Sequence, residues 1–254
     1  MSLSISLEPY APTWPGLFER EAESIAALLG ENCVTIHHVG STAVTGMKAK
    51  PIIDMIPVVH DIAIFDPVPF IARGYKFSGE LGMPFRRYLS FQGDSTAFHL
   101  HVWQDGHPEI EKNLLFCDYL RRHPEAVQDY ETVKESLAHY LPDNRAAYTR
   151  GKNEIIQSFV EKSGFTGLLL SNPFHEQEWI FYESLFEKRP TPLGIKPFVF
   201  YQGATLIGGA QLDASGIMAL RFVTITGEKQ APYFRNQLEK WHAMPPLQHC
   251  HSFS

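Results

Sequence analysis

Apolar residues follow a helical spacing at the start of the chain and then gather into short, dense runs. The spacing over residues 15–29 predicts a first helix, which the glycine after it should end. The run at 34–39 predicts a short strand, and PIIDMIPVV at 51–59 is the most β-like stretch of the chain. One or two strands should follow Gly74, with FHLHVW at 98–103 the best candidate.

A helical pattern returns at about residue 109 and continues to about residue 162. Pro124 and Pro142 divide this stretch into three predicted helices. The third should open near Asp143-Asn144, because aspartate and asparagine side chains cap helix N-termini well.

The pattern changes again after Gly164. Residues 165–179 form a mixed connector, and three strands and a short helix should follow at 197–213 (two strands joined by a turn), 216–225 and 234–243. We therefore expect an α+β protein with two domains, at 1–163 and 164–254.

Composition narrows the class of protein further. With 254 residues, 44% hydrophobic and 20% charged, the chain is predicted to be soluble and globular. A net charge of -6 gives no general reason to bind nucleic acid or an anionic membrane. The sequence contains neither an apolar run long enough for a membrane span nor the pattern of a signal peptide. Three irregularly spaced cysteines fit reduced thiols, so we expect a cytoplasmic location.

The chemically informative stretch is HHVGSTAVTGMKAKPIIDM, residues 37–55. A strand that ends in Gly40-Ser41 is suited to phosphate, because glycine allows close approach and exposed amides and a hydroxyl can bind the anion. Asp54 lies within an apolar strand, where a carboxylate is costly unless it binds a cation or a buried donor. The alternative is a structural carboxylate that caps loop amides.

Several stretches resemble the GrpB family, also called UPF0157. They are HHVGSTAV, KAKPIID, GELGMPFRRYL, FHLHV, NLLFCDYLRRHPEA, YETVK and YTRGKNEII, in order over about residues 8–162. The resemblance implies a nucleotidyltransferase-like fold, a mixed β-sheet backed by helices. In that superfamily a Gly-Ser turn holds the nucleotide phosphates, and acidic side chains bind two metal ions that assist transfer.

The sequence departs from the nucleotidyltransferase pattern at its acids. Ile56 stands where a second acid should follow Asp54, and a later strand carries His99 and His101 in place of a carboxylate. A divalent metal held by Asp54, His99 and His101 would be Mn or Zn rather than Mg, which prefers oxygen ligands. Alternatively no metal binds and the histidines contact phosphate or act as acid and base, or one of them is a satisfied, half-buried side chain.

A phosphate pocket would need donors from several parts of the chain. Lys50 and the Arg86-Arg87 pair lie in family-matching stretches, whereas Arg145 and Lys152 should share one helix face. Each of these charges taken singly could equally be a solvated surface group. The predicted phosphate-binding residues are Gly40, Ser41, Thr42, Lys50, Arg86, Arg87, Arg145 and Lys152.

The C-terminal part, residues 175–243, is similar to the middle of acetyltransferases of the GNAT superfamily. Its turn at 226–237 lacks the expected glycines, and Pro232 offers no amide donor. We therefore expect a small, partial GNAT-like α/β unit that pairs with the first domain or with a second copy of the chain. An incomplete sheet leaves an open edge that such pairing would cover.

Three functions remain open from the sequence. The first is metal-assisted nucleotidyl or phosphoryl transfer, in which the Gly40-Ser41 turn binds phosphate and Asp54 binds the metal. The second is a non-catalytic sensor of a nucleotide or CoA-type ligand, and the third is an interaction scaffold with a decayed acetyltransferase-like adaptor. Ile56 counts against the first function, and the Gly-Ser turn counts against the third. The expected partner is a nucleotide or another phosphorylated small molecule.

Overall fold

The computed structural model describes residues 5–94, 96–186 and 194–244. Contacts divide these residues into two units, one of residues 5–79 and 86–165 and one of residues 80–85 and 166–244. The segment 80–85 thus groups with the C-terminal unit, although unit 1 surrounds it in the sequence. The division into two domains at 1–163 and 164–254 stays a prediction.

Unit 1 is built on a five-stranded mixed sheet. Its order is β1-β2-β5-β4-β3, in which β2 and β5 are parallel and the other pairs are antiparallel. The strands are β1 (Cys33–Val39), β2 (Ile52–Val59), β3 (Lys76–Phe77), β4 (Arg87–Gln92) and β5 (Ala97–Gln104). The three strongest apolar runs of this part of the sequence are therefore confirmed as β1, β2 and β5.

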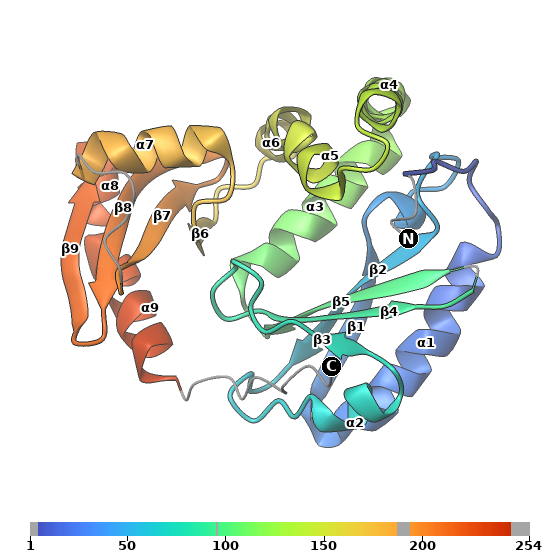
Figure 1. Cartoon of the computed structure of the whole chain (residues 1–254), viewed down its shortest axis with the longest axis horizontal. Coiled ribbons are helices and arrows are strands. Elements are labelled where there is room, and N and C mark those ends of the chain that lie inside the picture. Colours follow the sequence, from blue (N-terminus) through green and yellow to red (C-terminus); the bar gives the residue numbers. More distant parts are fainter. Residues whose placement is uncertain (1–4, 95, 187–193, 245–254) are drawn as a thin grey trace. The chain divides into compact units, whose positions relative to one another are not determined.

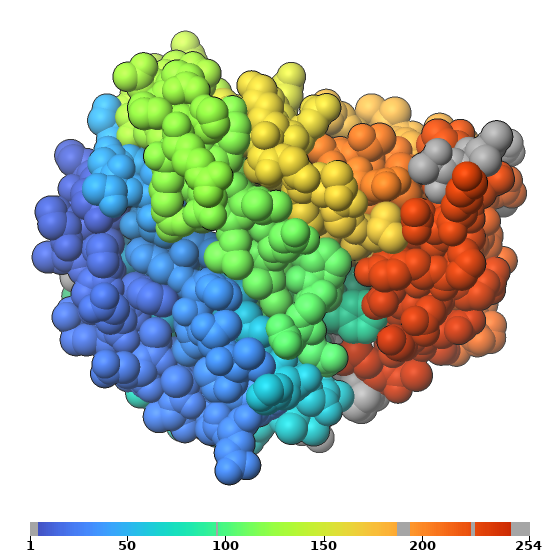
Figure 2. Space-filling model, turned by 180° about the vertical axis from the view of Figure 1, so that it is seen from behind, coloured from blue at the N-terminus to red at the C-terminus, as the bar shows by residue number. Residues whose placement is uncertain are grey.

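Helices lie on both sides of this sheet. Helix α1 (Trp14–Leu29) packs on β1 and β2, and Figure 1 shows it opposite the later helices. In Figure 2 the green α3–α4 segment lies directly beside the blue N-terminal segment. The remaining helices are α2 (Val68–Ala72), α3 (Pro108–Arg122), α4 (Pro124–Tyr140), α5 (Arg145–Gly151) and α6 (Asn153–Lys162).

The predicted third helix of the 109–162 stretch is interrupted. It opens as expected, with the Asn144 side chain accepting a hydrogen bond from Ala147 N, but it ends at Gly151 and resumes after Lys152. A Cβ at Gly151 would lie 2.5 Å from Leu137, so the glycine lets α5 approach α4 closely. The interruption places Lys152 at the junction of α5 and α6.

The two faces of the sheet differ in character. Ile53, Met55 and Leu100 are fully buried on the side that α1 covers, where Phe18 stacks on His38. Because side chains alternate along a strand, Asp54 points to the opposite face. The face toward α1 is therefore apolar, whereas the opposite face, which we call the polar face, carries Asp54, His99 and His101 beside buried apolar residues such as Ile56 and Val58.

Unit 2 is a four-stranded antiparallel sheet with three helices. The strand order is β6-β7-β8-β9, and Phe198, Phe200, Phe234 and Leu238 are buried in its core. The elements are β6 (Leu168–Ser171), α7 (Glu176–Phe186), β7 (Lys196–Gln202), β8 (Thr205–Asp213), β9 (Gly216–Phe222), α8 (Ile225–Lys229) and α9 (Ala231–Ala243). Two sheets with helices confirm the α+β class, whereas the GNAT-like character of unit 2 stays a prediction.

The connector predicted at 165–179 contains β6 and the start of α7. Helix α7 begins where the Glu178 carboxylate accepts hydrogen bonds from Phe174 N and His175 N, both at 2.7 Å. The same carboxylate accepts a third hydrogen bond, from the Tyr201 hydroxyl of β7. The first two bonds are local cap bonds, and the third ties the helix start to β7.

Two cysteines, Cys33 and Cys117, are free thiols, whereas Cys250 lies outside the described residues. Within the described parts of the chain, no helix combines the length and the apolar character needed to cross a membrane.

Candidate functional site

Asp54 lies at the centre of the polar face of unit 1. It is paired with Val39 on one side and with His99 on the other. Its Oδ1 lies 3.3 Å from His99 Nδ1 and 3.6 Å from His101 Nε2. The side chain is 32% exposed, so the group remains open to solvent. The structure thus brings the three predicted residues to one point.

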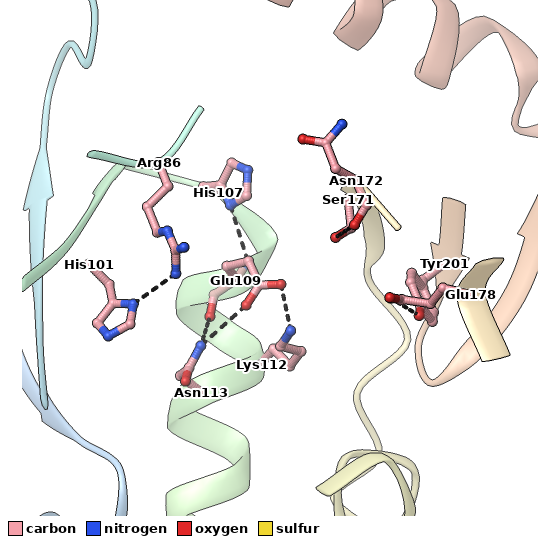
Figure 3. A network of polar contacts seen from close by, with 10 residues as sticks. All are labelled: Arg86, His101, His107, Glu109, Lys112, Asn113, Ser171, Asn172, Glu178 and Tyr201. Carbon is pink, nitrogen blue, oxygen red and sulfur yellow. Dashed lines mark hydrogen bonds and ion pairs between the residues drawn. The ribbon is translucent and has the colours of Figure 1, made fainter. Parts of the chain in front are cut away.

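Arg86 sets the protonation state of His101. Its Nη1 lies 3.1 Å from His101 Nδ1 (Figure 3). Because arginine offers only donors, Nδ1 accepts and the proton of the neutral imidazole is on Nε2, which faces Asp54. Burial and the charge of Arg86 lower the pKa of His101 against the opposing attraction of Asp54.

Asp54 is an ionised carboxylate at neutral pH. Burial raises its pKa, but the interactions with His101 and His99 outweigh burial and hold the pKa well below its usual range. The site therefore combines the fixed negative charge of Asp54 with the neutral imidazole of His101, whose pKa is lowered.

The metal predicted at Asp54, His99 and His101 can be compared with the geometry of these side chains. Among the described residues, no group of three His, Cys, Asp or Glu side chains is arranged to hold a metal ion. In the tautomer that Arg86 selects, His101 directs an N–H rather than a lone pair toward Asp54. A metal at this point would require loss of the Arg86 hydrogen bond, and the metal stays a prediction.

The Gly40-Ser41 turn lies directly against Asp54. Gly40 has φ +73° and ψ -169°, a conformation that is essentially restricted to glycine. A Cβ at Gly40 would lie 2.8 Å from Asp54 Oδ2. Thr42 is buried, and its hydroxyl donates to Ile52 O (3.1 Å) and accepts from His38 Nε2 (3.0 Å). Thr42 therefore attaches the turn to β2, and its hydroxyl forms its hydrogen bonds with protein groups rather than with a ligand.

Lys134 of α4 is a site residue that the sequence did not single out. Its side chain is buried, and its ammonium donates to Ser41 Oγ at 3.4 Å and to Lys48 O. Burial lowers the pKa of Lys134 to about 8. The only sequence signal for it is its place in the YETVK stretch that matches the family.

Lys50 and Lys152 share one aromatic ring. Their Nζ atoms lie 4.8 and 4.9 Å from the ring centroid of Tyr148, in cation–π geometry. Within the described part of the chain, neither ammonium lies within 4 Å of a carboxylate oxygen. Burial lowers the pKa of both lysines, and repulsion from Lys50 helps to lower that of Lys152 to about 8. Two such cations favour a bound anion.

The predicted arginines have different positions. Arg86 lies at the site and also stacks 5.1 Å from the ring centroid of Tyr88. Arg145, the first residue of α5, is exposed and lowers the pKa of Lys50 through its charge. Arg87 pairs with Val102, so strand alternation directs it to the apolar face, where it is buried. We therefore remove Arg87 from the predicted phosphate-binding set.

The lowered pKa of Lys152 predicts that the free energy of unfolding changes with pH in an alkaline window. Between its folded pKa of about 8 and the ordinary value of 10.5, the unfolded chain binds more protons than the folded chain. Stability should therefore rise with pH in this window, because the folded protein loses an unfavourable buried charge first. From about pH 7.5 to pH 9.5, denaturant unfolding should show wild type gaining about 1–2 kcal/mol relative to Lys152→Met. A constant difference between the two proteins would contradict this.

The family profile described as GrpB protein matches residues 4–162. The chain belongs to the GrpB family. The resemblance seen in the sequence is thereby confirmed. GrpB membership covers unit 1, and all candidate site residues, from Gly40 to Lys152, lie within the matched region.

Relatives of the chain include two UPF0157 proteins and one solved structure. The chain is 39% identical over 157 residues to UPF0157 protein YqkA of Bacillus subtilis, a match of 61% of this chain and 46% of that protein. It is 36% identical over 166 residues to a UPF0157 protein of Halalkalibacterium halodurans, covering 64% of this chain and 84% of that one. The crystal structure of conserved protein GrpB from Enterococcus faecalis matches with a TM-score of 0.58 and 36% identity, over 62% of this chain and 96% of that chain.

A third kind of relative bears a functional name. The dephospho-CoA kinase of Mycolicibacterium paratuberculosis is 28% identical over 175 residues, which cover 58% of this chain and 43% of that enzyme. The match therefore spans less than half of the kinase, as it spans less than half of YqkA.

Proposed function

We propose that unit 1 binds a phosphorylated small molecule, with a phosphoryl group between Lys50, Lys152 and the Gly40-Ser41 turn. The observation that carries the proposal is that Lys50 and Lys152 both lie over the Tyr148 ring. Among the described residues, neither lysine forms an ion pair with a carboxylate. A phosphoryl dianion would neutralise both ammonium groups and restore the pKa that burial lowers.

The remaining groups support the same site. The charge of Asp54 raises the pKa of Lys50 and of Lys152. The charge of Lys152 lowers the pKa of Lys134, so these four groups interact electrostatically. Lys134 holds the Ser41 hydroxyl, and Ser41 opens the turn whose glycine touches Asp54. Backbone amides at such a turn and the charge of Arg145 at the rim would add to the attraction for an anion.

We further propose that the ligand is a nucleotide or a CoA-type molecule and that unit 1 has a nucleotidyltransferase-like fold. A mixed sheet with a Gly-Ser turn beside a strand aspartate supports the fold. A relative named dephospho-CoA kinase supports the ligand class, although its match covers only part of each protein.

Metal-assisted nucleotidyl or phosphoryl transfer is the second candidate function. It is favoured by an ionised, solvent-accessible Asp54 whose charge raises the pKa of both Lys50 and Lys152. A divalent ion, if one binds there, would neutralise phosphate charge and orient the attacking group. Ile56 offers no second carboxylate, so binding without transfer remains the first proposal.

Asp54→Asn separates the two functions. In the binding proposal, removal of the negative charge beside two lysines should tighten phosphate binding several-fold without metal, because the anion no longer faces a like charge. In metal-assisted transfer, the same change should abolish a metal-dependent gain in ligand affinity. Thermal unfolding with inorganic phosphate, ATP or CoA, each with Mg, Mn, Zn or EDTA, would distinguish the two.

The size of the thermal shift gives the scale of the test. A ligand at 100 times its dissociation constant should add about 2.7 kcal/mol to the folded state. A shift in EDTA that grows in Asp54→Asn supports metal-free binding, and a shift that requires metal and disappears in the variant supports transfer. No shift with any ligand would overturn both proposals and favour an interaction scaffold.

A further inference from the structure

The segment 80–85 of unit 2 has a strained backbone. Leu81 has φ +45° and Phe85 has φ +70°, and no other non-glycine residue in the described ranges has a positive φ. For bulky side chains this conformation costs about 1–3 kcal/mol per residue and persists only where the surroundings hold it.

Hydrogen bonds within unit 2 hold this segment. The Trp241 Nε1–H of α9 donates to both carboxylate oxygens of Glu80, at 3.0 and 2.9 Å. Glu80 Oε1 also accepts from Phe85 N at 2.7 Å, and Asn172 N donates to Gly82 O at 3.2 Å. Glu80 thus connects a helix of unit 2 directly to the strained peptide at Phe85.

The Trp241 ring is itself fixed by its neighbours. Phe198 contacts it edge to face, with 5.1 Å between the ring centroids. Lys196 lies over the ring at 4.6 Å from its centroid. Trp241 therefore offers its indole N–H from a rigid position in unit 2.

The next residue after Phe85 is Arg86, whose Nη1 is hydrogen-bonded to His101 Nδ1 (Figure 3). The φ angle of Phe85 sets the direction in which the chain continues to Arg86 and β4. If Phe85 relaxed to an ordinary negative φ, the chain would change direction immediately before the arginine.

We propose that the hydrogen bonds between Glu80 and Trp241 of unit 2 position Arg86 beside His101, and that Arg86 so placed contributes to phosphate binding. Glu80 and Trp241 are then positioning residues, and neither touches the ligand. The role in ligand binding rests on the proposed function, whereas the effect on the Arg86 segment does not.

Trp241→Phe in the full-length chain tests this, because phenylalanine keeps an aromatic ring beside Phe198 and Lys196 but has no N–H. Amide hydrogen exchange over residues 81–88 should accelerate by roughly tenfold or more, with β7 and β8 unchanged. Affinity for inorganic phosphate should fall roughly tenfold. Glu80→Ala should reproduce both effects, and Glu80→Gln, which keeps an acceptor oxygen at this position, should largely preserve wild-type behaviour.

A double-mutant cycle shows whether the effect passes through Arg86. In an Arg86→Ala background, Trp241→Phe should weaken phosphate binding no further, since the positioned group is already missing. Additive losses, or unchanged exchange over 81–88 in Trp241→Phe and Glu80→Ala, would overturn the proposal. If wild type does not bind phosphate, the proposed function fails, and the exchange experiment alone then decides whether unit 2 holds the Arg86 segment.

Discussion

Replacing Lys152 by methionine should weaken the binding of inorganic phosphate roughly 10- to 100-fold, since a hydrogen bond to a charged group contributes about 1.5–3 kcal/mol. The apo protein should not be destabilised by the change. Lys152 is charged in the folded state at a cost, because burial and Lys50 lower its pKa to about 8. Methionine fills a similar volume over the Tyr148 ring and removes that cost. Isothermal titration calorimetry and thermal unfolding would measure the two effects separately.

The matched control is Lys76→Met, which removes a lysine exposed on β3 of the same unit. It makes the same change in net charge, so a general electrostatic effect would weaken binding equally in both variants. Equal affinities for phosphate in Lys76→Met and Lys152→Met would contradict the assignment of the anion site. A large loss of stability in Lys152→Met would show instead that the lysine has a structural role.

Replacing Gly40 by alanine should destabilise the protein by about 2–4 kcal/mol and displace Asp54. Two costs add at this position. The backbone angles of Gly40 lie in a region that alanine avoids, and the new Cβ would lie 2.8 Å from Asp54 Oδ2. Since Asp54 also faces His99 and His101, the contact should disturb the whole polar group. Denaturant unfolding measures the loss of stability, and phosphate titration measures the loss of the site.

Gly46→Ala separates the two costs. Gly46 also has a positive φ, +85°, but a Cβ there would have no neighbour within 4 Å. It should therefore show the backbone cost alone and retain phosphate binding. If both variants lost equal stability and binding, the close approach of Gly40 to Asp54 would have no functional importance.

The regular elements of unit 1 were predictable because their patterns are local. The helical spacing at 15–29 and the apolar runs that became β1, β2 and β5 each report burial against a neighbouring layer. The interruption at Gly151 was not predictable in the same way. A single glycine inside a helical pattern is only a weak local sign of a break, and its close packing on Leu137 of α4 leaves no periodic trace.

Most residues of the candidate site could likewise be named from the sequence. A glycine and serine after a strand, and a carboxylate inside an apolar strand, are unusual enough to identify Gly40, Ser41 and Asp54. Lys134 could not be found in this way, because an isolated lysine in a helix has the same local pattern whether it is solvated or buried. Tyr148 became part of the site only when Lys50 and Lys152 approached the same ring.

The sequence by itself indicated the family, the α+β class and the Gly40-Ser41 turn, because motifs and hydrophobic patterns can be read along the chain without its three-dimensional contacts. Only the tertiary structure separated Arg86 from Arg87. Adjacent residues of a strand point to opposite faces, so one arginine reaches His101 and the other is buried away from it. The tertiary structure also decided that Lys50 and Lys152 share the ring of Tyr148 and that residues 80–85 belong to unit 2. Both depend on contacts between distant segments, whose geometry is set by packing rather than by local pattern.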